Sequence, residues 1–219
     1  MSPWLFVVLG YLLGAVPASY VAGRLARGID LREHGSGNLG ATNTFRVLGA
    51  RVAAPVMVFD ILKGTFPVIA FGQWDAPASD PRWALAYGAA AIVGHVFSVY
   101  MRFKGGKGVA TSAGVFLGLA PVALGIGLVV WLGVLKATRM VSAASITAAV
   151  AVGVALLVTA VSPEEVRYLG LAVVAFVIFA HRSNIGRILS GTESRFGKGR
   201  EPEATVAAAA VTADAERPE

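Results

Sequence analysis

The sequence predicts an all-α integral membrane protein, a polytopic bundle of seven transmembrane helices. Three observations lead to this fold class: the composition, the length of the apolar segments and the placement of the basic residues. Hydrophobic residues make up 56% of the 219 residues and charged residues only 15%, whereas a soluble domain is usually about 25% charged. The mean hydropathy is +0.68. Because no soluble-looking block interrupts the apolar runs, we expect a single transmembrane domain over residues 1–200.

Six apolar segments have about the length of a membrane helix, which needs about 20 residues to cross about 30 Å of hydrocarbon. They cover residues 3–23, 52–72, 84–101, 108–135, 143–161 and 166–181. No Lys or Arg precedes the first segment, so it lacks the charged start of a signal peptide and is expected to be a retained helix. Residues 201–219 are rich in Ala and Glu without a patterned apolar face, which predicts a disordered tail.

The basic residues between these segments set the expected topology. They form four clusters, in residues 24–51, 102–107, 136–139 and 182–200, whereas the connections 73–83 and 162–167 are more acidic. If basic clusters face the cytoplasm, the N-terminus lies outside and the C-terminus inside. The segment 108–135 then separates two cytoplasmic clusters and must cross the membrane twice. A proline and three glycines within 117–127 favour a helical hairpin of two short, tilted or partly re-entrant helices there, which raises the count to seven.

The composition also excludes several classes of chemistry. The chain has no cysteine, which rules out thiolate catalysis, disulfides and cysteine-ligated metals. A Mg²⁺ site would need a cluster of carboxylates, but only Asp60, with Asp30 and Glu33 at a loop edge, is available near the polar motifs. We therefore expect no metal and no other cofactor. The net charge of +6 is interpreted as an orientation signal and an attraction to membrane lipids, and no nucleic acid is expected as a partner.

The first polar motif is HGSGNLGATNTFR, residues 34–46. Its glycines match the G-x-G-x-x-G spacing of dinucleotide folds, but a membrane helix precedes them instead of a strand, so that interpretation is weak. We favour a loop in which glycines let a ligand approach the backbone while polar side chains bind it. The alternative is a solvated loop whose Ser and Asn cap a helix. The candidate binding residues are Ser36, Gly37, Asn38, Gly40, Thr42, Asn43 and Arg46.

The second motif, FKGGKGVAT over residues 103–111, lies at the edge of an apolar helix. Lys104 and Lys107 flank Gly105 and Gly106, and Gly108 opens the next helix. Successive backbone N–H groups of a glycine-rich turn at a helix start can bind an anion, and the lysines add positive charge. The alternative, that the lysines only anchor the helix on the cytoplasmic side, explains the charge but not the three glycines.

The other candidates are polar residues in or beside predicted membrane helices. Asp60 and Lys63 share one face of a helix, where each unpaired charge costs about 2.5–3.5 kcal/mol, so they should pair or face a polar cavity. A structural ion pair and a direct ligand contact of Lys63 are both open. His181 and Asn184 lie three residues apart at the inner end of the last segment, where both can face one site. Ser142 follows a basic cluster and could add a hydroxyl.

Four of these motifs together resemble a known family. SGNLGATN, DILKGTFP, GHVFSVYMRFKGGKGVAT and HRSNIGRILSGTE are similar to those of the bacterial membrane acyl-phosphate:glycerol-3-phosphate acyltransferases, and the similarity covers residues 1 to about 196. The resemblance implies transfer of a fatty acyl group from acyl phosphate to the 1-hydroxyl of sn-glycerol 3-phosphate, giving lysophosphatidic acid and phosphate in phospholipid synthesis. It also implies a seven-helix fold in a bacterial inner membrane. The oligomeric state stays open, with a monomer as one option.

The resemblance and the motifs together define the candidate site. The candidate catalytic residues are Ser36, Arg46, Lys104, His181 and Asn184. The candidate substrate-binding residues are Gly37, Asn38, Gly40, Thr42, Asn43, Lys63, Gly105, Gly106, Lys107, Gly108 and Ser142. The H-x₄-D motif of other glycerolipid acyltransferases is absent from the sequence, so another group must accept the proton of the attacking hydroxyl.

We favour direct, metal-free transfer in which a phosphate oxygen of the donor takes that proton while His181 and Asn184 hold the acceptor. An acyl-Ser36 intermediate is the alternative within this chemistry. A transporter of phosphorylated or anionic solutes and a structural membrane subunit are the rival functions. The transporter is weakened because the polar motifs gather at one membrane face and no inverted repeat is visible.

Overall fold

The computed structural model describes residues 2–75, 80, 82–159 and 162–196, and within these ranges all regular structure is helical. The predicted tail at 201–219 lies outside the described residues and stays a prediction. In chain order the elements are α1 (Pro3–Ala15), α2 (Ala18–Arg27), α3 (Ala41–Leu48), α4 (Ala50–Phe66), the π-helical turn η1 (Pro67–Phe71), α5 (Gly72–Asp75), α6 (Arg82–Val96), the 3₁₀ turn η2 (Val99–Met101), α7 (Val109–Leu119), α8 (Pro121–Thr138), α9 (Val141–Val158), α10 (Glu164–Ala180) and α11 (Arg182–Leu189).

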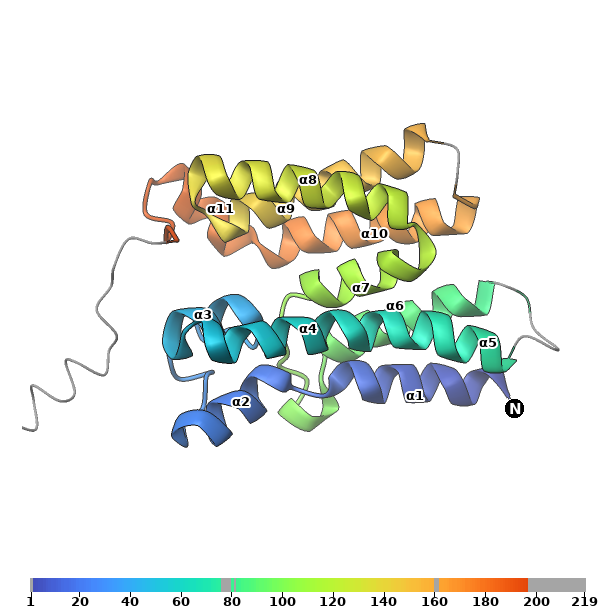
Figure 1. Cartoon of the computed structure of the whole chain (residues 1–219), viewed down its shortest axis with the longest axis horizontal. Coiled ribbons are helices and arrows are strands. Elements are labelled where there is room, and N and C mark those ends of the chain that lie inside the picture. Colours follow the sequence, from blue (N-terminus) through green and yellow to red (C-terminus); the bar gives the residue numbers. More distant parts are fainter. Residues whose placement is uncertain (1, 76–79, 81, 160–161, 197–219) are drawn as a thin grey trace, which may run out of the picture.

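The long helices lie roughly side by side in two groups (Figure 1). One group contains α1, α4 and α6, the other contains α8, α9 and α10, and α7 lies between them. The most extensive contacts join α1 to α6, α4 to α7 and α8 to α9. The main apolar core lies where α7 meets the second group: Val115 and Phe116 of α7 are buried with Leu156 of α9 and Val177 of α10.

Among the described residues, five helices are long and apolar enough to cross a membrane, or six if α10 and α11, bent by 57°, are counted as one span. They include Pro3–Arg27, which is interrupted between α1 and α2. This break was not predicted, although Pro17 lacks the N–H that a continuous helix needs. The remaining apolar helix, α7, has only 11 residues. The structure thus supports an all-helical membrane protein with five or six candidate spans.

The hairpin predicted at 108–135 breaks within the expected stretch, but one of its two helices is longer than predicted. The chain does break into two helices at Ala120, whose extended backbone ends α7 and precedes α8. However, α8 is 18 residues long and not short. Pro121 occupies the first turn of α8, where a missing N–H costs nothing, and the glycines that follow do not interrupt the helix.

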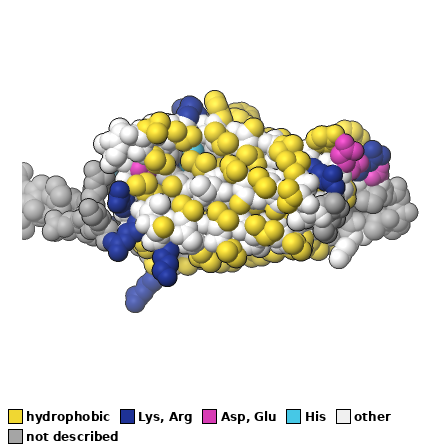
Figure 2. Space-filling view, turned by 90° about the horizontal axis from the view of Figure 1, so that it is seen from above, with side chains coloured by type: hydrophobic (Ala, Val, Ile, Leu, Met, Phe, Trp, Pro, Cys, Tyr) yellow, Lys and Arg dark blue, Asp and Glu magenta, His cyan; other side chains and the backbone are white. Residues whose placement is uncertain are grey.

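Charge is distributed unevenly along the bundle. In Figure 2 hydrophobic side chains cover most of the visible face, Lys and Arg gather at one end, and most visible Asp and Glu lie at the other. Figure 1 places α2, α3, α11 and the turn between α8 and α9 at the first end, which we call the basic end. The N-terminus, α5 and the start of α10 lie at the opposite end. The expected gathering of the polar motifs at one end is therefore found, although α7 begins well inside the bundle.

Glycines allow α4 and α7 to pack closely against each other. A Cβ added to Gly114 would lie 1.9 Å from the Ile61 carbonyl oxygen, and one added to Gly64 would lie 2.1 Å from that of Thr111. We expect Gly114→Ala to lower the free energy of unfolding by about 1–3 kcal/mol because it forces the helices apart. Thermal unfolding in detergent measures this. The control is Gly125→Ala, since a Cβ there meets nothing within 4 Å; equal stability of the two variants would contradict the packing.

Candidate active site

The glycine motif forms a tight loop that folds back on α6. The Gly105 N–H donates to the Val96 carbonyl (2.9 Å) and the Gly106 N–H donates to that of His95 (3.1 Å). A Cβ on Gly105 would lie 1.9 Å from the His95 carbonyl oxygen, so no larger residue fits. These two glycines are required by close packing, and their amides are already bonded to α6. The predicted anion site therefore does not use the N–H groups of Gly105 and Gly106.

The loop separates its two lysines. Lys107, just before Gly108 and α7, is half-buried, and its ammonium group donates a hydrogen bond to the Asn184 side-chain oxygen. Lys104 is exposed. Of the two, the structure brings Lys107 to the residues around α11, whereas the prediction gave the catalytic role to Lys104. The two glycines between them turn the chain inward, and Gly108, just after Lys107, has the positive φ (76°) that this turn requires.

A buried carboxylate, that of Glu193, organises the residues around Lys107. It is 8% exposed, and one of its oxygens accepts hydrogen bonds from the Ser142 hydroxyl and the Asn184 amide, both at 2.7 Å. The other accepts from the Arg187 Nε, also at 2.7 Å. Because Glu193 takes the N–H₂ of Asn184, the amide oxygen is left to face Lys107. Burial favours a raised pKa of the Glu193 carboxyl, but these hydrogen bonds outweigh it and lower the pKa.

The sequence analysis missed both Glu193 and Arg187. The signal was present, since Glu193 is the first acidic residue after Asn184 and closes the HRSNIGRILSGTE motif. Its contacts depend on the turn after α11 and on how that turn packs against Ser142 of α9, which the sequence pattern does not reveal. Glu193 is thus a further carboxylate among the polar motifs, in addition to Asp60, Asp30 and Glu33.

His181 follows the last residue of α10 and faces the same group. Its Nδ1–H donates to the Val177 carbonyl (2.8 Å), which leaves Nε2 as the acceptor of a neutral ring. In this arrangement the Nε2 of His181 can accept a hydrogen bond from a ligand.

Arg46, on α3, is the further cation of this group. The ring of its neighbour Phe45 stacks on Phe196 at 4.7 Å between centroids, and the Phe196 N–H donates to the Arg139 carbonyl, so α3 is held beside the turn between α8 and α9. Burial lowers the pKa of Lys107 to about 8; Glu193 opposes the shift, and the charges of Arg187 and Arg46 add to it. Together the residues around Lys107 form what we call the Lys107 group: Arg46, Lys107, Ser142, His181, Asn184, Arg187 and Glu193.

The chemistry of the Lys107 group suits an anion. Lys107, Arg46 and Arg187 outnumber the single carboxylate of Glu193, so the group carries an excess of positive charge. Serine, asparagine and neutral histidine add uncharged hydrogen-bonding groups. Within the described ranges, no set of three or more His, Asp or Glu lies close enough together to hold a metal ion.

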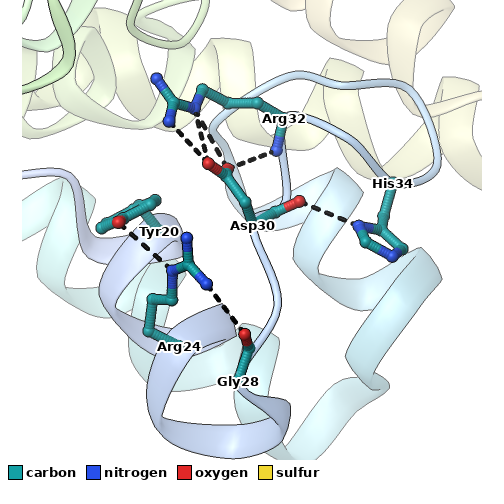
Figure 3. A network of polar contacts seen from close by, with 6 residues as sticks. All are labelled: Tyr20, Arg24, Gly28, Asp30, Arg32 and His34. Carbon is teal, nitrogen blue, oxygen red and sulfur yellow. Dashed lines mark hydrogen bonds and ion pairs between the residues drawn. The ribbon is translucent and has the colours of Figure 1, made fainter.

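The loop before α3 is held by its own side chains. Asp30 accepts hydrogen bonds from the Arg32 side chain and backbone N–H, and the His34 Nδ1–H donates to the Asp30 carbonyl (Figure 3). The side chain of Asn43 is buried; it accepts from the Ser36 N–H and donates to the carbonyls of Leu31 and His34. Asn43 therefore holds the loop and its amide is occupied, but it does not cap α3, whose N-cap Gly40 has no side-chain cap hydrogen bond.

The remaining candidates of this segment are partly or fully exposed. Ser36 and Thr42 are exposed, and Gly37, Asn38 and Gly40 are partly exposed. In the part of the chain that the structure describes, Ser36, Asn38 and Thr42 make no side-chain hydrogen bond to the Lys107 group. The Lys63 ammonium group lies 2.7 Å from the Asp60 carboxylate and donates to the Val16 carbonyl (3.0 Å). Of the two open interpretations, the geometry shows the ion pair.

A separate hollow of about 310 Å³ opens between α2 and η2. It is lined by Tyr20, Arg32, Tyr100, Met101 and Arg102. None of these residues belongs to the Lys107 group, so a ligand in this hollow would occupy a different site.

A family model described as "Glycerol-3-phosphate acyltransferase" matches residues 4–191. The chain belongs to the glycerol-3-phosphate acyltransferase family. A glycerol-3-phosphate acyltransferase of Bacillus cereus (strain G9842) is 44% identical over 200 residues, which cover 89% of this chain and 96% of the relative. One of Fusobacterium nucleatum is 41% identical over 196 residues, covering 90% of this chain and 99% of the relative.

Solved structures agree with the family. The glycerol 3-phosphate form of PlsY (YgiH), an integral membrane glycerol 3-phosphate acyltransferase, has a TM-score of 0.83 and 39% identity, and the match covers 90% of this chain and 96% of that one. Its lysophosphatidic acid form has a TM-score of 0.80 and 38% identity, with the same coverage. The chain is thus an integral membrane protein of this family. The comparisons do not support the transporter alternative.

Proposed function

We propose that this chain transfers a fatty acyl group from acyl phosphate to the 1-hydroxyl of sn-glycerol 3-phosphate, forming lysophosphatidic acid and inorganic phosphate. Membership of the family makes the chain an acyltransferase with glycerol 3-phosphate as acceptor. The site is assigned from the position of Lys107, a half-buried cation that is held by Asn184 and, through Asn184, by Glu193. The assignment of acyl phosphate as the donor is supported by the excess of positive charge in the site.

Most members of the Lys107 group, together with Ser36, have a role in this proposal. Lys107 and Arg46 neutralise the two phosphates that must meet, one on the donor and one on the acceptor. Asn184 and Ser142, both fixed by Glu193, hold the glycerol hydroxyls. Ser36, which is exposed in the structure, acts as a polar clamp on the bound substrate and not as a nucleophile.

The transfer itself is direct. The oxygen of the 1-hydroxyl attacks the acyl carbonyl carbon, a new ester bond forms, and the bond between that carbon and the phosphate oxygen breaks with its electron pair leaving on phosphate. The proton of the hydroxyl passes to an oxygen of the departing phosphate. His181, whose Nδ1–H is bonded to the Val177 carbonyl, accepts a hydrogen bond at Nε2 and orients the hydroxyl. Lys107 and Arg46 stabilise the charge that develops.

The pKa of Lys107 predicts how activity depends on pH. The ammonium form binds phosphate, and in the free enzyme it is lost as the pH rises through about 8. We therefore expect kcat/KM for glycerol 3-phosphate to fall above pH 8, since this ratio reports the free enzyme. In Lys107→Arg the alkaline limb should move upward, because guanidinium stays charged. An unchanged limb in Lys107→Arg would assign the titration to another group.

The membrane topology is part of the same proposal. We propose that α7 is a seventh crossing element, made short because the loop before it enters the bundle, and that the basic end faces the cytoplasm of a bacterial cell with the N-terminus outside. The placement of Lys and Arg at the basic end supports this orientation. A tag inserted at residue 121 should be reached from outside the cell; labelling only from the cytoplasm would contradict it.

A comparison of acyl donors tests the proposed function. Purified protein with glycerol 3-phosphate should form lysophosphatidic acid and release phosphate when given acyl phosphate, and should form little product with acyl-CoA of the same chain length. Preference for acyl-CoA would overturn the donor assignment. Failure with both donors, in protein that still binds glycerol 3-phosphate, would overturn the activity.

A further inference from the structure

A second polar cluster lies behind the glycine loop, buried among the membrane helices. Asp60 and Lys63 of α4 form an ion pair of 2.7 Å with side chains only 3% and 2% exposed. His95 of α6 completes the cluster, with its Nδ1 at 3.7 Å from Asp60. Each charge inside a membrane costs about 2.5–3.5 kcal/mol on insertion scales, so such charges are usually kept for function. The proposed mechanism uses none of these three residues.

The cluster connects two irregular parts of the chain. Lys63 donates to the carbonyl of Val16, at the break between α1 and α2. On its other side His95 touches the glycine loop, because its backbone carbonyl accepts the Gly106 N–H. A Cβ on Gly106 would lie 2.3 Å from the His95 Nε2 and 2.4 Å from the Leu39 carbonyl oxygen. The ring of His95 is therefore packed directly against Gly106, one residue before Lys107.

We propose that His95 is a positioning residue for Lys107: its ring, supported by the Asp60–Lys63 ion pair, forms the surface on which Gly106 rests and so fixes where Lys107 enters the site. This inference rests on the proposed role of Lys107. A small cavity of about 10 Å³, roughly the space of one water molecule, is lined by all three cluster residues together with Gly105 and Gly106. The loop therefore has little room to shift while the ring is present, and it can sink toward α4 when the ring is removed.

Three substitutions of His95 separate positioning from general stability. The Gln side chain places its terminal amide near the position of Nε2, which faces Gly106, whereas the Asn side chain places it near Nδ1, which faces Asp60. We expect His95→Ala to raise KM for glycerol 3-phosphate about tenfold, with a smaller change in kcat, because a displaced Lys107 binds the phosphate poorly. His95→Gln should recover most of this loss and His95→Asn should not. A folded His95→Ala variant with unchanged KM, or equal KM values for Gln and Asn, would overturn the proposal.

A double variant tests the support given by the ion pair and does not depend on whether His95→Ala folds. Apolar residues of similar size often replace a buried ion pair without loss of stability. We therefore expect Asp60→Leu with Lys63→Met to unfold at a temperature similar to that of the original protein, but to show a raised KM for glycerol 3-phosphate. Unchanged KM in this folded double variant would show that the pair does not support His95.

Lys107→Met, measured alongside, distinguishes this inference from the proposed function. If Lys107→Met keeps a normal KM, the proposed site itself fails. If Lys107→Met loses binding while the His95 variants do not, only the positioning role fails. The structural control is Ser145→Ala in α9, whose buried hydroxyl accepts a hydrogen bond from Trp131; it should leave KM unchanged.

Discussion

Lys107→Ala should lower kcat/KM by about 10²–10³, the loss seen when one donor to a developing oxyanion is removed. The reason is that Lys107 is the half-buried cation of the site, held by Asn184 at the point where the glycine loop meets α11. Steady-state kinetics with acyl phosphate and glycerol 3-phosphate measure the effect. Lys107→Met should behave in the same way, because it keeps the length of the side chain and removes only the charge.

Lys104→Ala is the matched control, since it removes the same charge from the same loop. Lys104 is exposed, so this variant should keep nearly all of the activity. A large loss in Lys104→Ala together with a small loss in Lys107→Ala would contradict the assignment and restore the catalytic role that the sequence suggested for Lys104.

Glu193→Gln should produce the second large effect. The carboxylate accepts from Ser142 and Asn184 at one oxygen and from Arg187 at the other, and an amide of the same shape cannot accept at both positions. One donor is left without a partner, which costs about 1–3 kcal/mol of stability when buried. Asn184 is also free to turn, so we expect kcat/KM to fall about 100-fold as the substrate is misplaced.

Thermal unfolding and kinetics of Glu193→Gln measure the two effects separately. Glu164→Gln is the control, because Glu164 is an exposed carboxylate at the opposite end of the bundle, bonded to the Tyr168 hydroxyl. It should change neither quantity appreciably. If Glu193→Gln remains fully active, the carboxylate does not orient Asn184 for catalysis.

Most of the fold could be predicted from the sequence because apolar length and charge placement are strong signals in a membrane. The segments at 52–72 and 143–161 correspond closely to α4 with its η1 continuation and to α9. The break at Ala120 also followed from composition. The length of α8 did not, because the effect of a proline depends on whether it lies inside a helix or in its first turn, where Pro121 lies.

The site was predictable in part. The sequence named Lys107, His181 and Asn184 as candidates, because a Gly-rich turn and spacing by three residues are local signals, and the structure brings these three residues together. It could not choose between the two lysines, since this choice depends on the hydrogen bonds by which Gly105 and Gly106 fold onto α6. It also missed Glu193, whose contacts depend on the turn after α11, where Gly191 has a positive φ (72°), and on the packing of that turn against Ser142 of α9. Long-range geometry of this kind is not contained in a single sequence pattern.

The most direct test of the central claim is an experimental structure of the chain with glycerol 3-phosphate bound. In the proposed site, Lys107 is held by Asn184 and Glu193 and binds the phosphate of the acceptor. The expected result is a phosphate oxygen within hydrogen-bonding distance of the Lys107 ammonium group, with the 1-hydroxyl near His181. A phosphate bound instead at Lys104, or in the hollow lined by Tyr20 and Arg102, would contradict the claim.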